Sequence, residues 1–362
     1  MSSTRALSVI VPAHNSSATL PRALTAILAS ELPRDGYELI VVDDASSDGS
    51  AEIAARYADT VVRLTGRVSG PAYARNRGAE LAQGEILAFV DPDAMVRADT
   101  LPRMLAMMSD NHGLAAVSAS HDQSAPTRNL VSQYWNLLLH FGDQRQAGSS
   151  GNVASPCAAT RRLVFLSVGM YDEWRFGTTA LEGIELGKRL EDSGCVVKSN
   201  KDLAIAGLRR WNLRSLCREV WTRSALLARS LGYQQTRAAV PNEVVFTLSR
   251  SLAPVFALTC LVAVSAASLP RPDMLVAVAI ALFGAIALNL PALVFFAKAR
   301  GIIFAIAVAP LHLLVQALSS LGLCAGWILR DAVGDRAPDA AIQAYAEVGV
   351  ETWPPVPRAT GG

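Results

Sequence analysis

Short apolar runs alternate with amphipathic stretches through the first third of the chain. Apolar runs rich in β-branched residues are typical of buried strands, and strands joined by helices predict an α/β fold with a mostly parallel sheet and flanking helices. The expected strands are Leu7–Pro12, Tyr37–Val42, Thr60–Leu64 and Ile86–Val90, and the expected helices are Ala18–Ser30, Ser50–Tyr57 and Gly70–Leu81. Binding loops of such sheets lie at the carboxyl ends of the strands.

The C-terminal third has a different pattern. Three long runs contain no Asp, Glu, Lys or Arg: Leu252–Pro270, Met274–Ala297 and Gly301–Leu329. Each is long enough to cross a hydrocarbon layer of about 30 Å as a helix. The alternative, buried core helices of a large soluble domain, is disfavoured because three such runs are hard to cover. We therefore expect an α-helical transmembrane domain of about three helices at 251–330.

Basic residues give this domain an expected orientation. Lys298 and Arg300 lie between the second and third runs. The positive-inside rule places these residues and the arginines before the first run in the cytoplasm, so three crossings leave the chain after Arg330 outside. Ala6–Ala13 is too short for a signal peptide and has no small-residue cleavage site, which keeps the N-terminal domain cytoplasmic. The arginines before the first run are Arg210, Arg214, Arg218, Arg223, Arg229, Arg237 and Arg250.

Composition excludes some classes of function. The net charge of +2 gives no indication of a nucleic-acid partner, and the hydrophobic fraction of 51% is concentrated in the C-terminal runs. The five cysteines are scattered, without zinc-site spacing, and are expected to be free thiols. The phosphate-binding patterns GxxxxGK[ST] and GxGxxG are absent, which disfavours nucleotidyl or phosphoryl transfer.

Two acidic pairs follow expected strands. Asp43 and Asp44 come directly after Tyr37–Val42. A capped turn explains the following serines and Asp48, but two adjacent acids leaving a buried strand need partners, which the N–H and O–H groups of a base or ribose would supply. Asp91 and Asp93 follow Ile86–Val90 with a proline between them. Acidic pairs end strands by chance as well, but such oxygen ligands suit Mg²⁺ or Mn²⁺, which would neutralise a departing diphosphate.

Four segments follow one another along the chain: Ser8–Asn15, the Asp43-Asp44 segment, Gly70–Gly78 and Gly84–Asp93. Together they resemble the family 2 glycosyltransferases of the GT-A fold. The likeness is close over about the first 100 residues and continues more loosely to about residue 215. It implies that Asp91 and Asp93 form a metal-binding DxD motif. It also implies a nucleotide-sugar site made by Pro12, Ala13, Asn15, Asp43, Asp44, Arg75 and Asp91. Arg75 could alternatively be a helix-surface cation.

The acceptor side of the resemblance contains one departure. Gly151–Ala154 and Val168–Glu173 resemble the family's acceptor-side loop and "vGgfDe" turn, and Ala180–Leu190 aligns with its ED-containing helix. In inverting members the aspartate of that ED pair is the catalytic base, whereas this chain has Gly183. Three alternatives follow. Glu182 is the base, with Glu185 a weaker substitute; or an anionic lipid phosphate accepts the sugar and needs no base; or the protein is an inactive homologue that acts as a binding or scaffold protein.

The segment after the resemblance is basic. Arg209-Arg210-Trp211 is similar to the end of the QxxRW motif of processive synthases, but Gly207 replaces its glutamine, so processive synthesis is disfavoured. Arg209–Arg229 is predicted to be an interfacial amphipathic helix, or alternatively a solvated basic face on the catalytic domain.

The predicted organisation is a GT-A catalytic domain at 1–215, with a nucleotide-sugar half at 1–120 and an acceptor half at 121–215. An interfacial linker at 216–250, transmembrane helices at 251–330 and a flexible tail at 331–362 follow. The predicted function is sugar transfer, with inversion, from a nucleotide-diphosphate donor to a lipid-linked or glycan acceptor, by a multi-pass protein of the cell membrane.

Overall fold

A nine-stranded sheet is the framework of the residues that the structure describes. The computed structural model describes residues 5–146, 153, 155–173, 182–233, 272–329 and 349–353. They divide into two units. The sheet unit is made from residues 1–127, 143–209 and 335–362, and the helical unit from residues 128–142 and 210–334. The organisation thus differs from the predicted one, because 128–142 belongs to the helical unit and the end of the chain to the sheet unit.

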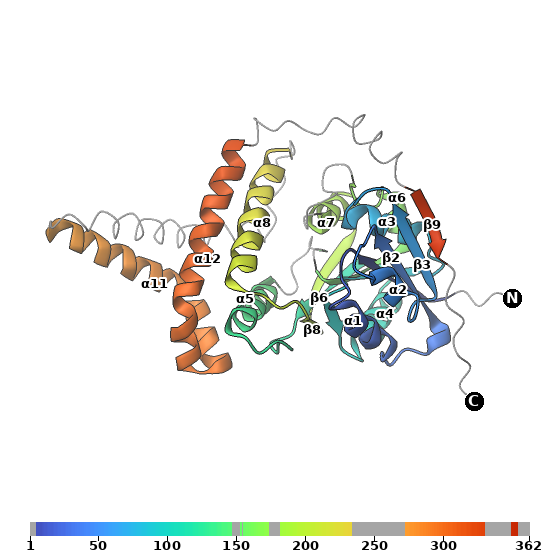
Figure 1. Cartoon of the computed structure of the whole chain (residues 1–362), viewed down its shortest axis with the longest axis horizontal. Helices are drawn as coiled ribbons and strands as arrows, with labels where there is room; N and C mark the ends of the chain where they lie inside the picture. The colour runs from blue at the N-terminus through green and yellow to red at the C-terminus, as the bar shows by residue number, and fades with distance from the viewer. Residues whose placement is uncertain are drawn as a thin grey trace. The chain divides into compact units, whose positions relative to one another are not determined.

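The predicted strands and helices of the first 100 residues are confirmed within one or two residues at most ends. The strands are β1 (Leu7–Ala13), β2 (Tyr37–Asp44), β3 (Thr60–Thr65) and β4 (Ile86–Val90). The helices are α1 (Leu20–Leu28), α2 (Ser50–Ala54) and α3 (Pro71–Leu81). The strands β4, β1, β2 and β3 are neighbours in this order and run parallel. Helices cover this part of the sheet, as Figure 1 shows.

The rest of the sheet is mixed rather than mostly parallel. Its strands are β5 (Ala94–Val96), β6 (Leu114–His121), β7 (Cys157–Arg161), β8 (Val196–Gly207) and β9 (Gly349–Trp353), in the overall order β5-β8-β6-β7-β4-β1-β2-β3-β9. β7 pairs antiparallel with both β4 and β6, whereas β6 and β8 are parallel. The helices α4 (Thr100–Asp110), α6 (Arg162–Ser167) and α7 (Glu182–Asp192) complete the sheet unit.

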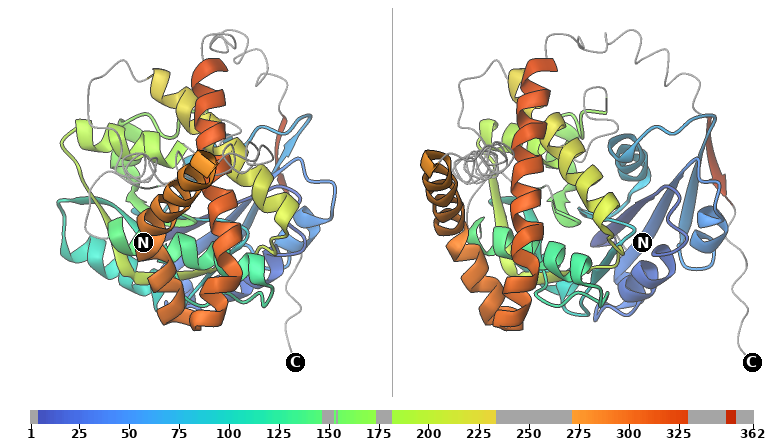
Figure 2. Two further views of the ribbon diagram at one scale, coloured as in Figure 1. Left: turned by 90° about the vertical axis from the view of Figure 1, so that its left-hand side faces the viewer. Right: turned by 60° about the vertical axis from the view of Figure 1, so that its left-hand side comes forward.

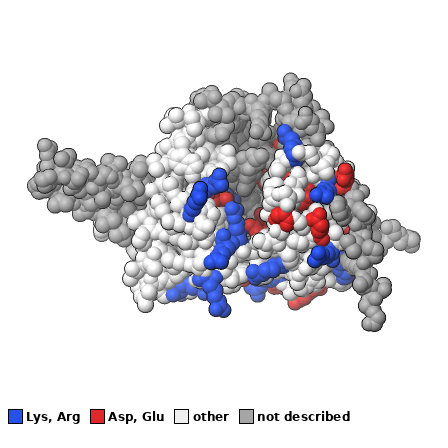
Figure 3. Space-filling model, viewed as in Figure 1, with Lys and Arg blue, Asp and Glu red and all other residues white. Residues whose placement is uncertain are grey.

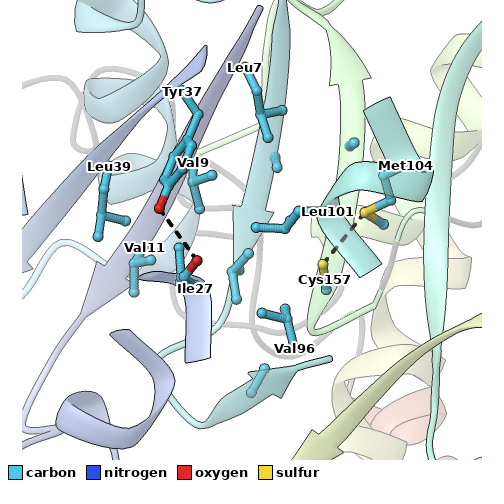
Figure 4. Packing of buried hydrophobic residues seen from close by; sticks show 14 of the residues in the cluster. Leu7, Val9, Val11, Ile27, Tyr37, Leu39, Val96, Leu101, Met104 and Cys157 are labelled. Carbon is cyan, nitrogen blue, oxygen red and sulfur yellow. Dashed lines mark hydrogen bonds between the residues drawn. The ribbon is translucent and has the colours of Figure 1, made fainter. Parts of the chain in front are cut away.

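A core of buried apolar side chains lies under the parallel strands. Figure 4 shows apolar side chains from β1, β2, α1 and α4 packed together, with the Tyr37 hydroxyl donating to the carbonyl of Ile27 at 3.5 Å. Cys157 lies in the same core 3.8 Å from the sulfur of Met104, and burial raises the pKa of its thiol to about 12. Cys157, Cys195, Cys217 and Cys324 are free thiols, as expected, and Cys260 lies outside the described residues.

The last strand corrects the prediction of a flexible tail. β9 pairs antiparallel with β3, from Gly349 opposite Thr65 to Trp353 opposite Val61. A β-carbon on Gly349 would lie 2.3 Å from Oγ1 of Thr65, so a larger residue at this position would require the Thr65 side chain to move. The remaining residues of the predicted tail lie outside the described residues.

The helical unit contains α8 (Leu213–Tyr233), α11 (Pro272–Arg300), α12 (Ile302–Leu329) and most of α5 (Leu130–Gln146). The second and third uncharged runs are helices α11 and α12, and the first lies outside the described residues. Among the described residues, α12 alone is long and apolar enough to cross a membrane, with a mean hydropathy of 2.1. Figure 2 shows α8 and α12 side by side.

Candidate active site

The predicted donor-side residues meet at one edge of the sheet. β1 and β2 are in register so that Ala13 lies opposite Asp43, and Phe89 near the end of β4 lies opposite Ile10 of β1. The carboxyl ends of β2, β1 and β4 therefore bring Asp43 and Asp91 to the same edge, on either side of β1. Pro12 and Ala13 are buried between them.

Asn15 ties the loops after β1 and β2 together. Its backbone adopts a positive φ of 46°, and its side-chain oxygen accepts a hydrogen bond from the Ser47 N–H at 2.9 Å. Asp48 accepts the Ser17 N–H at 2.9 Å. Burial works against ionisation of Asp48, but hydrogen bonds from Ser50 and Ser17 outweigh it and lower its pKa to about 2. These contacts fix the rim of the site.

Asp43 has an acceptor atom that nothing in the described chain satisfies. The side chain is fully buried, Oδ2 accepts the Ser46 N–H at 3.3 Å, and Oδ1 has no hydrogen-bond partner among the described residues. Burial raises the pKa of Asp43, against the hydrogen bonds from Ser46. A buried carboxylate oxygen without a donor is costly, and a ligand N–H or O–H would relieve that cost.

Asp44 has a different role from its neighbour. Its carboxylate accepts the Ser69 N–H at 2.8 Å and the Gly70 N–H at 2.7 Å, which fixes the loop before α3. Gly70 has a φ of +97°, which favours glycine. Asp44 was predicted to contact the nucleotide-sugar, but its carboxylate is engaged by the chain itself.

Arg75 joins three parts of the site. Its guanidinium donates to Asp91 Oδ1 at 2.6 Å and to Glu182 Oε1 at 2.5 Å. Burial lowers the pKa of Arg75, but the charges of Asp91 and Glu182 outweigh burial and raise it overall. The ring of Tyr171 lies 5.6 Å from the guanidinium carbon. Arg75 is therefore an internal cation rather than the helix-surface cation of the alternative prediction.

Glu182 begins α7 and is 4% exposed. Its Oε1 pairs with Arg75, while Oε2 is buried without a hydrogen-bond partner among the described residues. Burial raises the pKa of Glu182, and Arg75 opposes this rise. Glu185 instead forms a bidentate ion pair with Arg189, whose Nε donates to Oε1 at 2.7 Å and whose Nη2 donates to Oε2 at 2.5 Å. Arg189 also donates to the carbonyl of Met170. The two predicted candidates for the base thus have separate surroundings.

Asp91 and Asp93 form a fixed acidic turn. The Ala94 N–H donates to the Asp91 carbonyl at 3.0 Å, and the Leu208 N–H donates to the Asp93 carbonyl at 2.7 Å. Burial and the charge of Asp91 raise the pKa of Asp93 to about 6, whereas Arg209 lowers it. The two carboxylates therefore repel each other, and a cation between them would relieve the repulsion.

No group of three or more His, Cys, Asp or Glu side chains suited to a metal occurs among the described residues. The turn still fits Mg²⁺ or Mn²⁺, which need only one or two carboxylates beside substrate phosphates.

Sequence reasoning missed two positioning residues. Asn76 donates to the carbonyl of Tyr171 at 2.9 Å and accepts the Tyr171 N–H at 3.1 Å, so α3 holds the turn that precedes α7. Asn76 stands beside Arg75 in a segment singled out for the resemblance, which was the available signal. Arg209, noted as part of a processive-synthase motif and as the start of the predicted interfacial helix, contributes its charge at Asp93.

Comparisons with known proteins all find glycosyltransferases. Residues 8–169 match the family described as Glycosyl transferase family 2. The chain is 28% identical to glycosyltransferase AglE of Haloferax volcanii over 152 residues, which are 41% of this chain and 49% of that protein. It is 32% identical over 109 residues to the poly(ribitol-phosphate) β-N-acetylglucosaminyltransferase TarS of Staphylococcus aureus, covering 29% of this chain and 19% of that protein. The chain thus spans half or less of these curated relatives.

A solved structure has the same fold. The mannosyltransferase PcManGT of Pyrobaculum calidifontis, in complex with GDP-Man and Mn²⁺, superposes with a TM-score of 0.54 at 19% identity. The likeness covers 90% of this chain and 86% of that one. At this identity it establishes a shared fold.

Proposed function

Since this chain belongs to glycosyl transferase family 2 through residues 8–169, with a GT-A-like α/β fold, we propose that it transfers a sugar from a nucleotide-diphosphate donor to an acceptor at a membrane, with inversion. One observation carries the proposal. Asp43, with a buried oxygen that has no donor among the described residues, and the Asp91–Asp93 turn lie at the same edge of the sheet.

The donor's nucleoside would occupy the edge beside Asp43. Its ribose or base would donate to Oδ1 of Asp43, and Pro12 and Ala13 would form the floor. Asn15 would act through the loop that it holds. The complex of PcManGT with GDP-Man and Mn²⁺ supports a nucleotide-sugar with a divalent cation as the ligand pair.

Asp91 and Asp93 would hold Mg²⁺ or Mn²⁺ together with the donor phosphates. Bound there, the cation would neutralise the negative charge that develops on the departing diphosphate. Arg75 keeps Asp91 oriented through its bond at 2.6 Å. The role of the chain is therefore to hold the diphosphate in place and to position Asp91.

Transfer forms a bond between an acceptor oxygen and the anomeric carbon and breaks the bond from that carbon to the diphosphate. A hydroxyl acceptor also loses a proton, and Glu182 would take it, because its raised pKa and its Oε2 atom without a partner suit a base. Attack opposite the departing group inverts the anomeric carbon. A lipid phosphate acceptor is already anionic, and Glu182 would then only hold Arg75.

The acceptor is proposed to be lipid-linked or part of a glycan, with the protein in the cell membrane and its sheet unit in the cytoplasm. The uncharged runs and the apolar helix α12 support the membrane location. TarS is named as acting on a poly(ribitol-phosphate), which supports a polymer of this kind as one acceptor class.

Release of nucleoside diphosphate tests the proposal. Full-length protein in detergent is given a panel of nucleotide-sugars with membrane lipid extract, with and without Mn²⁺ or Mg²⁺. We expect metal-dependent release that Asp91→Asn and Asp93→Asn abolish, while Asp99→Asn, at the residue before α4 and with its side chain 39% exposed, keeps it. Full activity of both turn variants would remove the metal assignment, and no release with any donor would favour the inactive homologue.

A further inference from the structure

The helices α11 and α12 are joined by a turn of one residue. Helix α11 ends at Arg300 and α12 begins at Ile302, and Figure 2 shows the chain turning from one into the other. Gly301 has a φ of +91°, and its N–H donates to the carbonyl of Ala297 at 2.8 Å. This left-handed conformation favours glycine, so the chain changes direction within a single residue. Residues 290–306, on either side of this turn, are called the hairpin end.

The inner side of the hairpin end is packed inside the helical unit. Ala292, Phe296 and Ala305 are buried in one apolar cluster with residues of α5. The rings of Phe296 and Tyr134 have centroids 5.7 Å apart, and the Tyr134 hydroxyl lies 2.9 Å from Nδ1 of His312. Both α11 and α12 are therefore held on α5, which gives the hairpin end one fixed inner side.

The outer side of the hairpin end is apolar and exposed. On α12, Ile302, Ile303 and Ile306 are 65%, 82% and 67% exposed. On α11, Leu290 and Val294 are 52% and 42% exposed. Residues three or four positions apart lie on the same side of a helix, so each helix presents its apolar side chains together. Single exposed apolar side chains are normal in soluble proteins, but a gathering of them marks an interaction surface.

Basic residues accompany these apolar side chains. Lys298 and Arg300 are exposed beside the turn, and Lys298 follows Val294 by one helical turn. The sequence has no Asp or Glu between Asp273 and Asp331. Among the described residues of the helical unit, Lys and Arg outnumber Asp and Glu by eight to two, although the net charge of the whole chain is only +2. Figure 3 shows basic side chains along α8 of the same unit. A partner that fits this surface is therefore both apolar and negatively charged.

We propose that the hairpin end docks into a membrane leaflet that contains anionic lipids. The isoleucines Ile302, Ile303 and Ile306 lie among the acyl chains, and Lys298 and Arg300 lie at the headgroups. This inference rests on the membrane location proposed above, and it names the surface and the lipid class.

The physical chemistry of lipid surfaces supports this occupant. Apolar side chains beside Lys and Arg suit the boundary between headgroups and acyl chains, and each basic residue near an anionic leaflet strengthens binding. The long stems of Lys298 and Arg300 let their charges reach lipid phosphates while their neighbours are buried. A second copy of the chain is a poorer occupant, because two such basic surfaces would repel each other.

Site-specific fluorescence in vesicles tests the docking. The full-length chain, with its five native cysteines replaced by serine or alanine, carries one new cysteine labelled with a nitrobenzoxadiazole dye. It is reconstituted into phosphatidylcholine vesicles with and without phosphatidylglycerol, and lipids with brominated acyl chains are the quencher. We expect the dye at I303C and at I306C to lose intensity and to shift its emission to shorter wavelength, most strongly with phosphatidylglycerol. The control is L163C, because Leu163 is 72% exposed on α6 of the sheet unit, and its dye should keep its intensity.

The double variant K298Q/R300Q tests the charges. In the I303C chain it should remove the additional quenching that phosphatidylglycerol produces. Equal quenching of I303C with and without phosphatidylglycerol would contradict the anionic lipid class. Quenching of L163C as strong as that of I303C would show that the dye itself drives the contact, and would overturn the proposal.

The remaining outcomes separate this inference from the proposed function. Flotation of the chain with the vesicles and release of nucleoside diphosphate are measured on the same samples. A chain that floats and turns over donor, but whose I303C and I306C dyes are not quenched, contradicts the docking alone. A disulfide between two I303C chains in place of quenching would assign the hairpin end to a second copy. Quenching without turnover would contradict only the proposed activity, and a chain that does not float would contradict the membrane location as well.

Discussion

Glu182, at the first position of α7, accepts a hydrogen bond from Arg75 on α3 at 2.5 Å, although the two residues are 107 positions apart in the chain. Arg75 also reaches Asp91, so one buried guanidinium connects the acceptor-side helix with the acidic turn after β4. The residue expected to act as the base and the residue expected to hold a cation are thus oriented by the same group.

Replacement of Arg75 by methionine should impair both folding and turnover. It leaves the buried carboxylate of Glu182 without its cation, and breaking a buried pair in this way typically costs about 3–5 kcal/mol. Denaturant unfolding measures the stability loss. Arg75→Lys should restore part of the stability but little activity, because one ammonium cannot reproduce both guanidinium bonds. Arg77→Lys, two positions along the same helix, is the control. Wild-type turnover in Arg75→Met would show that the connection has no catalytic role.

Glu182→Gln should distinguish a hydroxyl acceptor, which needs a base, from an anionic phosphate acceptor, which does not. Glutamine keeps the shape of the side chain but cannot take a proton, and loss of a general base typically lowers the rate by about 10²–10⁴-fold. The measurement is kcat with a hydroxyl acceptor once the donor panel has identified the sugar. Glu185→Gln is the matched control on the same helix, since Arg189 holds that carboxylate. A change of less than about threefold in Glu182→Gln would favour the anionic phosphate acceptor.

Asp44→Ala should lower the free energy of unfolding of the protein, because the role of Asp44 is structural rather than in donor chemistry. It removes the acceptor of two buried backbone N–H groups, Ser69 and Gly70, and each donor left unsatisfied costs about 1–3 kcal/mol. The free energy of unfolding measures this loss. Asp44→Asn keeps one acceptor oxygen and should recover part of it. Equal stability of the alanine variant and the wild type would contradict the role assigned to Asp44.

Asp48 should make the stability of the rim pH-dependent. Its pKa is lowered to about 2 in the folded protein, against about 3.9 for an ordinary aspartate. A lowered carboxyl pKa stabilises the folded state above the unfolded pKa, and this stabilisation is lost as the pH falls through the folded value. The stability difference between wild type and Asp48→Ala should therefore be constant above pH ~5 and shrink as the pH falls to about 2. A pH-independent difference would contradict the lowered pKa.

The parallel strands were predictable from sequence because β1 to β4 are short apolar runs whose lengths and flanking turns fit one pattern. The acidic ends of β2 and β4 followed from the same pattern, since the edge of a parallel sheet collects the residues that leave its strands. The different roles of Asp43 and Asp44 could not be predicted, because they depend on which carboxylate meets the backbone of Ser69 and Gly70. Nor could the pairing of β9, since Gly349–Trp353 finds its partner nearly 300 positions earlier in the chain.

Binding of a nucleoside diphosphate to Asp43 variants tests the central claim most directly. Isothermal titration of the full-length protein in detergent with UDP and with GDP, in the presence of Mn²⁺, measures Kd without requiring the acceptor. We expect one of them to bind, and Asp43→Ala to weaken that binding at least about tenfold, a loss of about 1.4 kcal/mol, while Asp59→Ala at the far end of the sheet leaves Kd unchanged. Equal binding by Asp43→Ala and the wild type, or no binding of either nucleotide to a folded wild-type protein, would contradict the account.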